Sequence, residues 1–209
     1  MKQPDTLLHL YYVLMMISFI ISTFFYTRSR AVKMIFYLLL SSVTVEAIVE
    51  VCKLLRCKYY ILYHFFTPLE YTLIALYFYF AVNNKTFKIY NLCTIVLFLA
   101  ICTVSISINY RLESFPRVIS YLECFLIIIL SVLALLLLDI DPHKPVYRIS
   151  DFWFANAFLF FNAGLFIVLF FDQGQKEIQQ LFRVINQSFN CLFYILLSIG
   201  FLCLKIKKI

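Results

Sequence analysis

Glycine, proline and charged residues are scarce in this chain. Its 209 residues include three Gly, five Pro and one Trp, and only 14% of them are charged. A membrane β-barrel would show alternating strands of about ten residues separated by turn residues, so this composition argues against a barrel and against an irregular fold. No stretch is long or polar enough to fold as a separate water-soluble domain. We therefore expect one domain, residues 1–209.

Motifs that would name a reaction are also missing. The absence of Gly-x-Ser-x-Gly excludes a serine nucleophile elbow, and the absence of Cys-x-x-Cys weakens a redox or metal interpretation of the seven cysteines. Seven-span hydrolases that resemble adiponectin receptors and alkaline ceramidases have a His-x-x-x-His pair in the last span. The last apolar stretch here contains no His, and its Lys205 stands at its end rather than at the mid-span position that a retinal protein needs.

Apolar stretches occupy almost all of the sequence, of which 64% is hydrophobic. A hydrocarbon core of roughly 30 Å is crossed by about 20 apolar residues in helical form. The predicted spans are 7–26, 34–55, 60–82, 90–110, 117–138, 152–171 and 184–204. The expected fold is all-α, a polytopic integral membrane protein built as a bundle of seven transmembrane helices.

The net charge of +7 is distributed in small groups over the connectors. Lys and Arg in such positions meet anionic lipid headgroups, so the expected partner is the lipid bilayer and not nucleic acid. The connectors after spans one, three and five, together with the C-terminal tail, hold the larger share of the basic residues: Arg28, Arg30, Lys33, Lys85, Lys88, Lys144, Arg148, Lys205, Lys207 and Lys208. The positive-inside rule then predicts a multi-pass protein of the inner (plasma) membrane, with its N-terminus outside and its C-terminus in the cytoplasm.

Polar residues inside the predicted spans are the main functional clue, because a carboxylate at membrane depth costs roughly 2.5 to 3.5 kcal/mol on insertion scales. The candidate ligand-binding residues are Glu46, Glu50, His64, Glu70, Glu123, Asn162, Asn186 and Asn190. Successive spans run in opposite directions, so most of these residues fall in the half of the bundle nearer the N-terminus. The opposite half is expected to be almost entirely Phe, Leu, Ile and Tyr.

Two interpretations of these polar residues are open. A cup of convergent polar groups in an apolar bundle is typical of a small-molecule or ion site. Buried Asn and Glu can instead connect helices by hydrogen bonds without any ligand, and Glu50 can pair with Lys53 three residues later. The sequence indicates no catalytic residue, no metal ligand and no particular cofactor.

Three functions are compatible with such a cup. The preferred hypothesis is a sensor that binds a small ligand or ion in the outer half of the bundle and signals through a partner protein. One alternative is an intramembrane metal-dependent lipid hydrolase, with Glu46, Glu70, Glu123 and His64 as ligands. The other is a proton- or cation-coupled transporter, which the apolar inner half disfavours. Enzymatic activity is left open.

Three motifs accompany the aromatic-rich composition: His-Phe-Phe-x-Pro-Leu-Glu-Tyr from His64, Phe-Trp-Phe from Phe152, and Asn-x-x-x-Asn-x-Leu-x-Tyr from Asn186. With these motifs the chain resembles small seven-span membrane proteins of Bacteroidota that have no assigned activity. The resemblance covers most of the chain. It implies the seven-helix architecture and no particular function.

Overall fold

The structure, a computed structural model, describes residues 4–108, 115–138, 145–171 and 176–206. These residues form seven long helices and one short 3₁₀ helix, and no strand occurs among them. The elements are α1 (Pro4–Thr23), α2 (Arg30–Leu54), α3 (Tyr60–Ala81), α4 (Lys85–Ile108), α5 (Arg117–Leu136), η1 (Val146–Arg148), α6 (Ser150–Phe171) and α7 (Lys176–Ile206). The predicted all-α membrane bundle is confirmed, and each predicted span coincides with most of one helix.

Local sequence signals set several helix ends. The Ser29 hydroxyl accepts a hydrogen bond from the Val32 backbone N–H at 3.1 Å and caps α2. The Asn84 side chain accepts one from the Phe87 N–H at 3.0 Å at the start of α4. These side chains satisfy backbone donors that the first turn of a helix leaves open.

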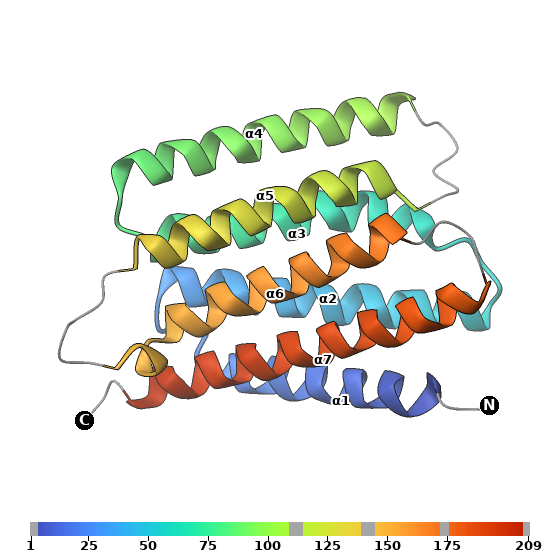
Figure 1. The fold of residues 1–209 in the computed structure, drawn as a ribbon, viewed down its shortest axis with the longest axis horizontal. Helices are drawn as coiled ribbons and strands as arrows, with labels where there is room; N and C mark the ends of the chain where they lie inside the picture. The colour runs from blue at the N-terminus through green and yellow to red at the C-terminus, as the bar shows by residue number, and fades with distance from the viewer. Residues whose placement is uncertain (1–3, 109–114, 139–144, 172–175, 207–209) are drawn as a thin grey trace.

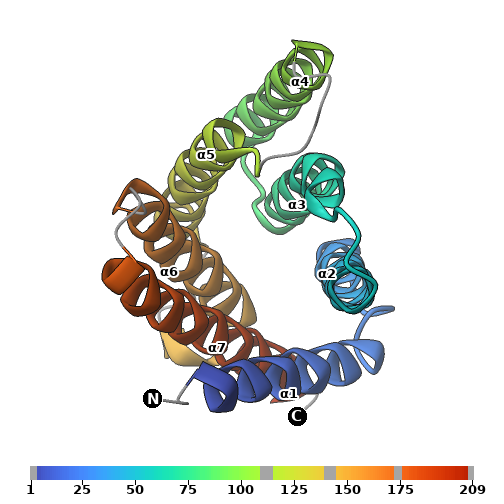
Figure 2. The ribbon, with the colours of Figure 1, turned by 90° about the vertical axis from the view of Figure 1, so that its right-hand side faces the viewer.

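Six helices form a closed helix ring in the order α1, α2, α3, α5, α6 and α7, and α7 packs on α1 to close it. The helix α4 lies outside this ring against α3 and α5, as Figure 2 shows end-on. Consecutive helices run antiparallel, so the two chain ends lie at opposite ends of the bundle (Figure 1). We call the end at which α1 and α7 begin the N-terminal end, and the opposite one the C-terminal end.

Six of the long helices are long and apolar enough to cross a membrane: α1, α2, α4, α5, α6 and α7. Large apolar side chains on them face outward, among them Val13, Val96 and Val118. The protein is thus a multi-pass membrane protein. The helix α3 is long enough but its mean hydropathy is lower, because it carries several tyrosines together with His64, Pro68 and Glu70.

Aromatic side chains fill the helix ring toward its C-terminal end. This aromatic floor consists of Tyr77 and Phe78 on α3, Phe154 and Phe158 on α6, and Phe193 and Phe201 on α7, all buried. Centroids of contacting aromatic rings lie 5.1–5.8 Å apart, within the range of favourable aromatic pairs. Most of these rings lie nearer the C-terminal end of the bundle than the polar residues described next.

Candidate ligand site

Three carboxyl groups from different helices approach one another inside the helix ring. Glu70 of α3 lies close enough to Glu46 of α2 and to Glu123 of α5 for direct electrostatic interaction. Glu123 occupies the buried face of α5, one turn from Ile119 and one turn from Ile127. Helical periodicity therefore turns this carboxyl group toward the interior with the apolar residues of the same face.

Glu123 is the most deeply buried of the three. Its side chain is 5% exposed, and its Oε1 atom has no hydrogen-bond partner in the part of the chain that the structure describes. A buried polar atom without a partner costs roughly 1–3 kcal/mol, more when it is charged. Native structures contain few such atoms, and each of them calls for an explanation.

Two tyrosines from α1 and α7 line the same space. Tyr11 is 8% exposed and its hydroxyl faces the Glu46 carboxyl group, while Tyr194 is 4% exposed and lies near both Glu46 and Glu70. The two tyrosine rings contact each other, with centroids 5.7 Å apart. The α1–α7 contact thus brings hydroxyl groups to the carboxyl groups of α2 and α3.

Gln187 lines the same space nearer the N-terminal end of the bundle. It precedes Tyr194 by about two helical turns and so lies on the same face of α7. Its side chain is 9% exposed, and its Oε1 atom, like Glu123 Oε1, is a buried oxygen without a hydrogen-bond partner among the described residues. We call the set Tyr11, Glu46, Glu70, Glu123, Gln187 and Tyr194 the carboxyl layer.

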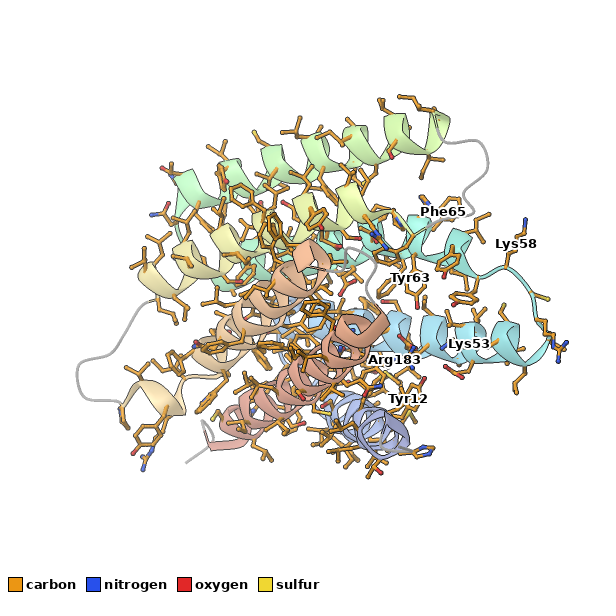
Figure 3. All side chains as sticks on the ribbon, turned by 45° about the vertical axis from the view of Figure 1, so that its right-hand side comes forward. Tyr12, Lys53, Lys58, Tyr63, Phe65 and Arg183 are labelled. Carbon is orange, nitrogen blue, oxygen red and sulfur yellow. The ribbon has the colours of Figure 1, made fainter. Side chains whose placement is uncertain are left out.

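A second group of polar side chains surrounds the N-terminal end of the helix ring above this layer. The Tyr12 hydroxyl donates a hydrogen bond to Glu50 Oε1 at 2.8 Å, and Lys53 Nζ lies 2.6 Å from the same oxygen. Figure 3 shows Tyr63 and Arg183 at the same end of the bundle. We call Tyr12, Glu50, Lys53, Tyr63 and Arg183 the rim.

The predicted site residues thus fall into different environments. Glu46, Glu70 and Glu123 converge in the interior, whereas Glu50 forms the expected ion pair with Lys53 at the rim. His64 is buried in α3. The predicted pairing of Glu50 with Lys53 is confirmed. The three deeper carboxyl groups lie near one another, as the cup hypothesis expects.

The predicted asparagines use their amide donors within their own helices. Asn162 Nδ2 donates to the Phe158 carbonyl at 2.9 Å, and Asn190 Nδ2 donates to the Asn186 carbonyl at 2.8 Å and to the Asn186 Oδ1 at 3.3 Å. Such bonds to the preceding turn are common for short polar side chains in helices. Among the described residues, the hydrogen bonds from Asn162 Nδ2 and Asn190 Nδ2 thus stay within one helix.

Sequence reasoning missed three members of the carboxyl layer. Tyr11 stands near the start of its span, where tyrosines commonly lie at the membrane interface, but its side chain is buried inside the helix ring. Gln187 and Tyr194 could have been found from the sequence, because a spacing of seven residues places them on one face of a helix. Arg183, four residues before Gln187, lies on the same face. Using that spacing required knowing which face of α7 turns inward.

The expectation of an almost entirely apolar opposite half is also wrong. The Tyr77 hydroxyl donates to Asp151 Oδ1 at 3.0 Å and joins α3 to α6, and Asn91 Nδ2 donates to the Ala75 carbonyl at 2.7 Å and joins α4 to α3. Ser131 is fully buried in α5. Polar contacts between helices therefore occur in both halves, while the convergent carboxyl groups occur in one.

Of the residues in the hydrolase hypothesis, Glu46, Glu70 and Glu123 approach one another inside the helix ring. Within the described ranges, no three His, Cys, Asp or Glu side chains lie in an arrangement that could hold a metal ion. No family model matches the sequence, and no curated protein or solved structure matches it. The function must therefore be inferred from the carboxyl layer itself.

The charge balance defines what the carboxyl layer can bind. No Lys or Arg is among the buried side chains that the structure describes; those at this end of the bundle lie at the rim or in the connectors. Burial of a carboxylate is unfavourable unless a cation or a hydrogen-bond donor compensates it. A ligand that brings positive charge and N–H donors would supply both.

Proposed function

We propose that this protein is a membrane-embedded binding protein that takes a small ammonium ligand into the carboxyl layer from the N-terminal end of the bundle. The observation that carries this proposal is the unpartnered carboxyl oxygen of Glu123, buried beside Glu70. An ammonium group placed between these side chains would donate hydrogen bonds to that oxygen. It would also offset the charge of the neighbouring carboxyl groups.

The aromatic side chains around the carboxyl groups favour an organic cation. Tyr11 and Tyr194 lie beside Glu46, and Tyr63 lies near both Glu46 and Glu50. Faces of aromatic rings attract ammonium groups within about 6 Å, by roughly 0.5–2 kcal/mol. Carboxyl groups next to tyrosine rings thus give charge recognition and apolar contact in one place.

The aromatic floor supports binding at a closed site over conduction. Tyr77, Phe154 and Phe158 are at most 1% exposed, and the Tyr77 ring, about two helical turns beyond Glu70, contacts the rings of Phe154 and Phe158. A transported cation would have to pass these rings. We therefore prefer a binding protein to the transporter alternative.

Within this proposal α3 is the seventh membrane crossing. Its 22 residues would span about 33 Å, and it packs within the bundle against α2, α4 and α5. Its polar side chains His64 and Thr67 are buried in the bundle instead of facing lipid. An odd number of crossings fits an N-terminal end that faces outward, toward external ligands, and a C-terminal tail in the cytoplasm.

A sensing role through a partner protein is the further expectation for this site. Each helix connector is short, so a signal would pass to another chain at the C-terminal end. Proximity labelling from a C-terminal fusion, compared between cells with and without the bound amine, tests this part separately. Labelling that does not change with the amine would speak against sensing and leave binding intact.

The binding proposal is tested on detergent-purified protein with ethanolamine as the probe at pH 7, where the amine is protonated. Isothermal titration is run on the wild type and on Glu123→Gln, which keeps the shape of the side chain. Asp151→Asn is the matched control, because Asp151 lies at the C-terminal end of the bundle, and the oxygen of the new amide can still accept the hydrogen bond from the Tyr77 hydroxyl. We expect Glu123→Gln to weaken binding about tenfold or more, as for loss of a charged hydrogen bond, and Asp151→Asn to retain it.

Two results would overturn the proposal. One is the absence of ethanolamine binding to the wild type. The other is a Glu123→Gln variant that binds equally well but melts at a lower temperature, which is the behaviour of a carboxyl group that only holds helices together.

A further inference from the structure

Arg183 stands on the inward face of α7, one helical turn before Gln187. It precedes Gln187 by four residues, so the two side chains lie one above the other on one face of the helix. Arg183 is exposed, and Figure 3 shows it at the N-terminal end of the bundle together with Tyr12 and Lys53. The ion pair found among the described residues joins Lys53 to Glu50 and does not include Arg183.

The site therefore has opposite charges at two depths. The carboxyl layer holds Glu46, Glu70 and Glu123, whereas the rim holds two cations, Lys53 and Arg183, and the single carboxylate of Glu50. The levels are about one helical turn apart, roughly 5.4 Å, as the spacings of Glu46 from Glu50 and of Gln187 from Arg183 indicate. A ligand that carries only an ammonium group would leave the rim arginine unused and would meet its positive charge on entry.

We infer that the ligand is a small zwitterion, with an ammonium group in the carboxyl layer and a carboxylate or phosphate held at the rim by Arg183. This inference rests on the proposed function and adds the anionic end of the ligand. A guanidinium group recognises both carboxylate and phosphate through paired N–H donors. Gln187, buried on the rim side of the carboxyl layer one helical turn from Arg183, offers an amide to the middle of such a molecule.

The same chemistry has two natural sources. A soluble molecule such as an amino acid carries both charges within a few atoms. A phosphatidylethanolamine headgroup carries an ammonium group and a phosphate separated by two carbons, and it stands at the depth of the rim in a bilayer. The experiment below includes an arm for each source.

The test compares two soluble probes that differ only in the anionic group, ethanolamine and O-phosphoethanolamine. Both are titrated into the full chain as wild type, Arg183→Gln and Arg28→Gln. Arg28 is the matched control, an exposed arginine at the C-terminal end that lies over the Phe25 ring. Size-exclusion profiles and melting temperatures check that each variant is folded.

We expect the wild type to bind O-phosphoethanolamine about tenfold or more tightly than ethanolamine, because one charged hydrogen-bonded contact is added. Arg183→Gln should remove this preference and leave ethanolamine affinity unchanged or slightly higher. Arg28→Gln should behave as the wild type. Equal affinity of the wild type for the two probes, or a preference that survives in Arg183→Gln, would overturn the inference while ethanolamine binding still supports the proposed function.

If neither probe binds the wild type, the proposed function and this inference fail together. To identify the source of the zwitterion, O-phosphoethanolamine is titrated into the protein in phosphatidylglycerol nanodiscs made with or without phosphatidylethanolamine. Competition by phosphatidylethanolamine against soluble O-phosphoethanolamine supports the inference with the lipid headgroup as ligand. Unchanged titration supports it with a soluble zwitterion as ligand.

Discussion

The aromatic ring of Phe154 on α6 lies directly over Gly200 on α7, where a Cβ atom would stand 2.5 Å from Phe154 Cε1. The same relationship occurs in reverse between Gly164 on α6 and Phe189 on α7, where a Cβ atom would stand 2.4 Å from the aromatic ring. Two of the three glycines thus allow one pair of helices to approach closely, as small residues do in membrane bundles.

Gly200→Ala should destabilise the protein by about 1–3 kcal/mol, the usual cost of overpacking a core. The Phe154 ring has little room to move, because it is fully buried and contacts Tyr77 and Phe201. The melting temperature in detergent measures the effect. Ala47→Val adds two methyl groups at an exposed position of α2 and should leave the melting temperature unchanged; an equal shift in both variants would contradict the interpretation.

Arg56→Gly should stabilise the connector after α2. Arg56 has a φ of 54°, and the hydrogen bond from the Cys57 N–H to the Cys52 carbonyl at 2.8 Å forms the helix-ending motif that usually has glycine at this position. A left-handed conformation costs an L-residue about 1–2 kcal/mol, so the melting temperature should rise. Arg56→Ala keeps that cost and should give no gain. Equal melting temperatures of the glycine and alanine variants would show that the backbone conformation is not responsible.

Gln187→Leu should raise the stability of the ligand-free protein and weaken ethanolamine binding. The substitution removes a buried oxygen without a partner, which is worth roughly 1 kcal/mol, and it removes a polar group from the carboxyl layer. Melting curves and titrations measure the two effects. Ser188→Ala is the neighbouring control, since Ser188 is exposed and bonds to the Val184 carbonyl of its own helix. A lower melting temperature with unchanged binding would assign Gln187 a purely structural role.

Cys57 should react with a membrane-impermeant maleimide in intact cells. Its side chain is exposed in the connector between α2 and α3, at the end of the bundle that the positive-inside rule places outside. Cys57→Ser should lose this labelling. Labelling of the wild type only after cell lysis would reverse the orientation.

The sequence determined the class of the protein and the position of its helices. Crossing a bilayer is a property of each segment separately, because it depends on the length and apolar content of about 20 consecutive residues. The alternating direction of such segments then placed Glu123 in the half of the bundle nearer the N-terminus, and Glu46 and Glu70 near the middle of their spans, before any packing was known. The ion pair between Glu50 and Lys53 was equally predictable, because both residues lie on one turn of one helix.

The tertiary structure decided which helices are neighbours and which faces turn inward. In a lipid bilayer any apolar helix face can point outward, so hydrophobicity does not determine which helices pack together. Close approach and shape complementarity between helices determine it. Only the closed ring with α4 outside it shows that Tyr11 and Tyr194 face the carboxyl groups. For the same reason the missing partners of Glu123 and Gln187 are visible only in the packed molecule, since they depend on residues from several helices at once.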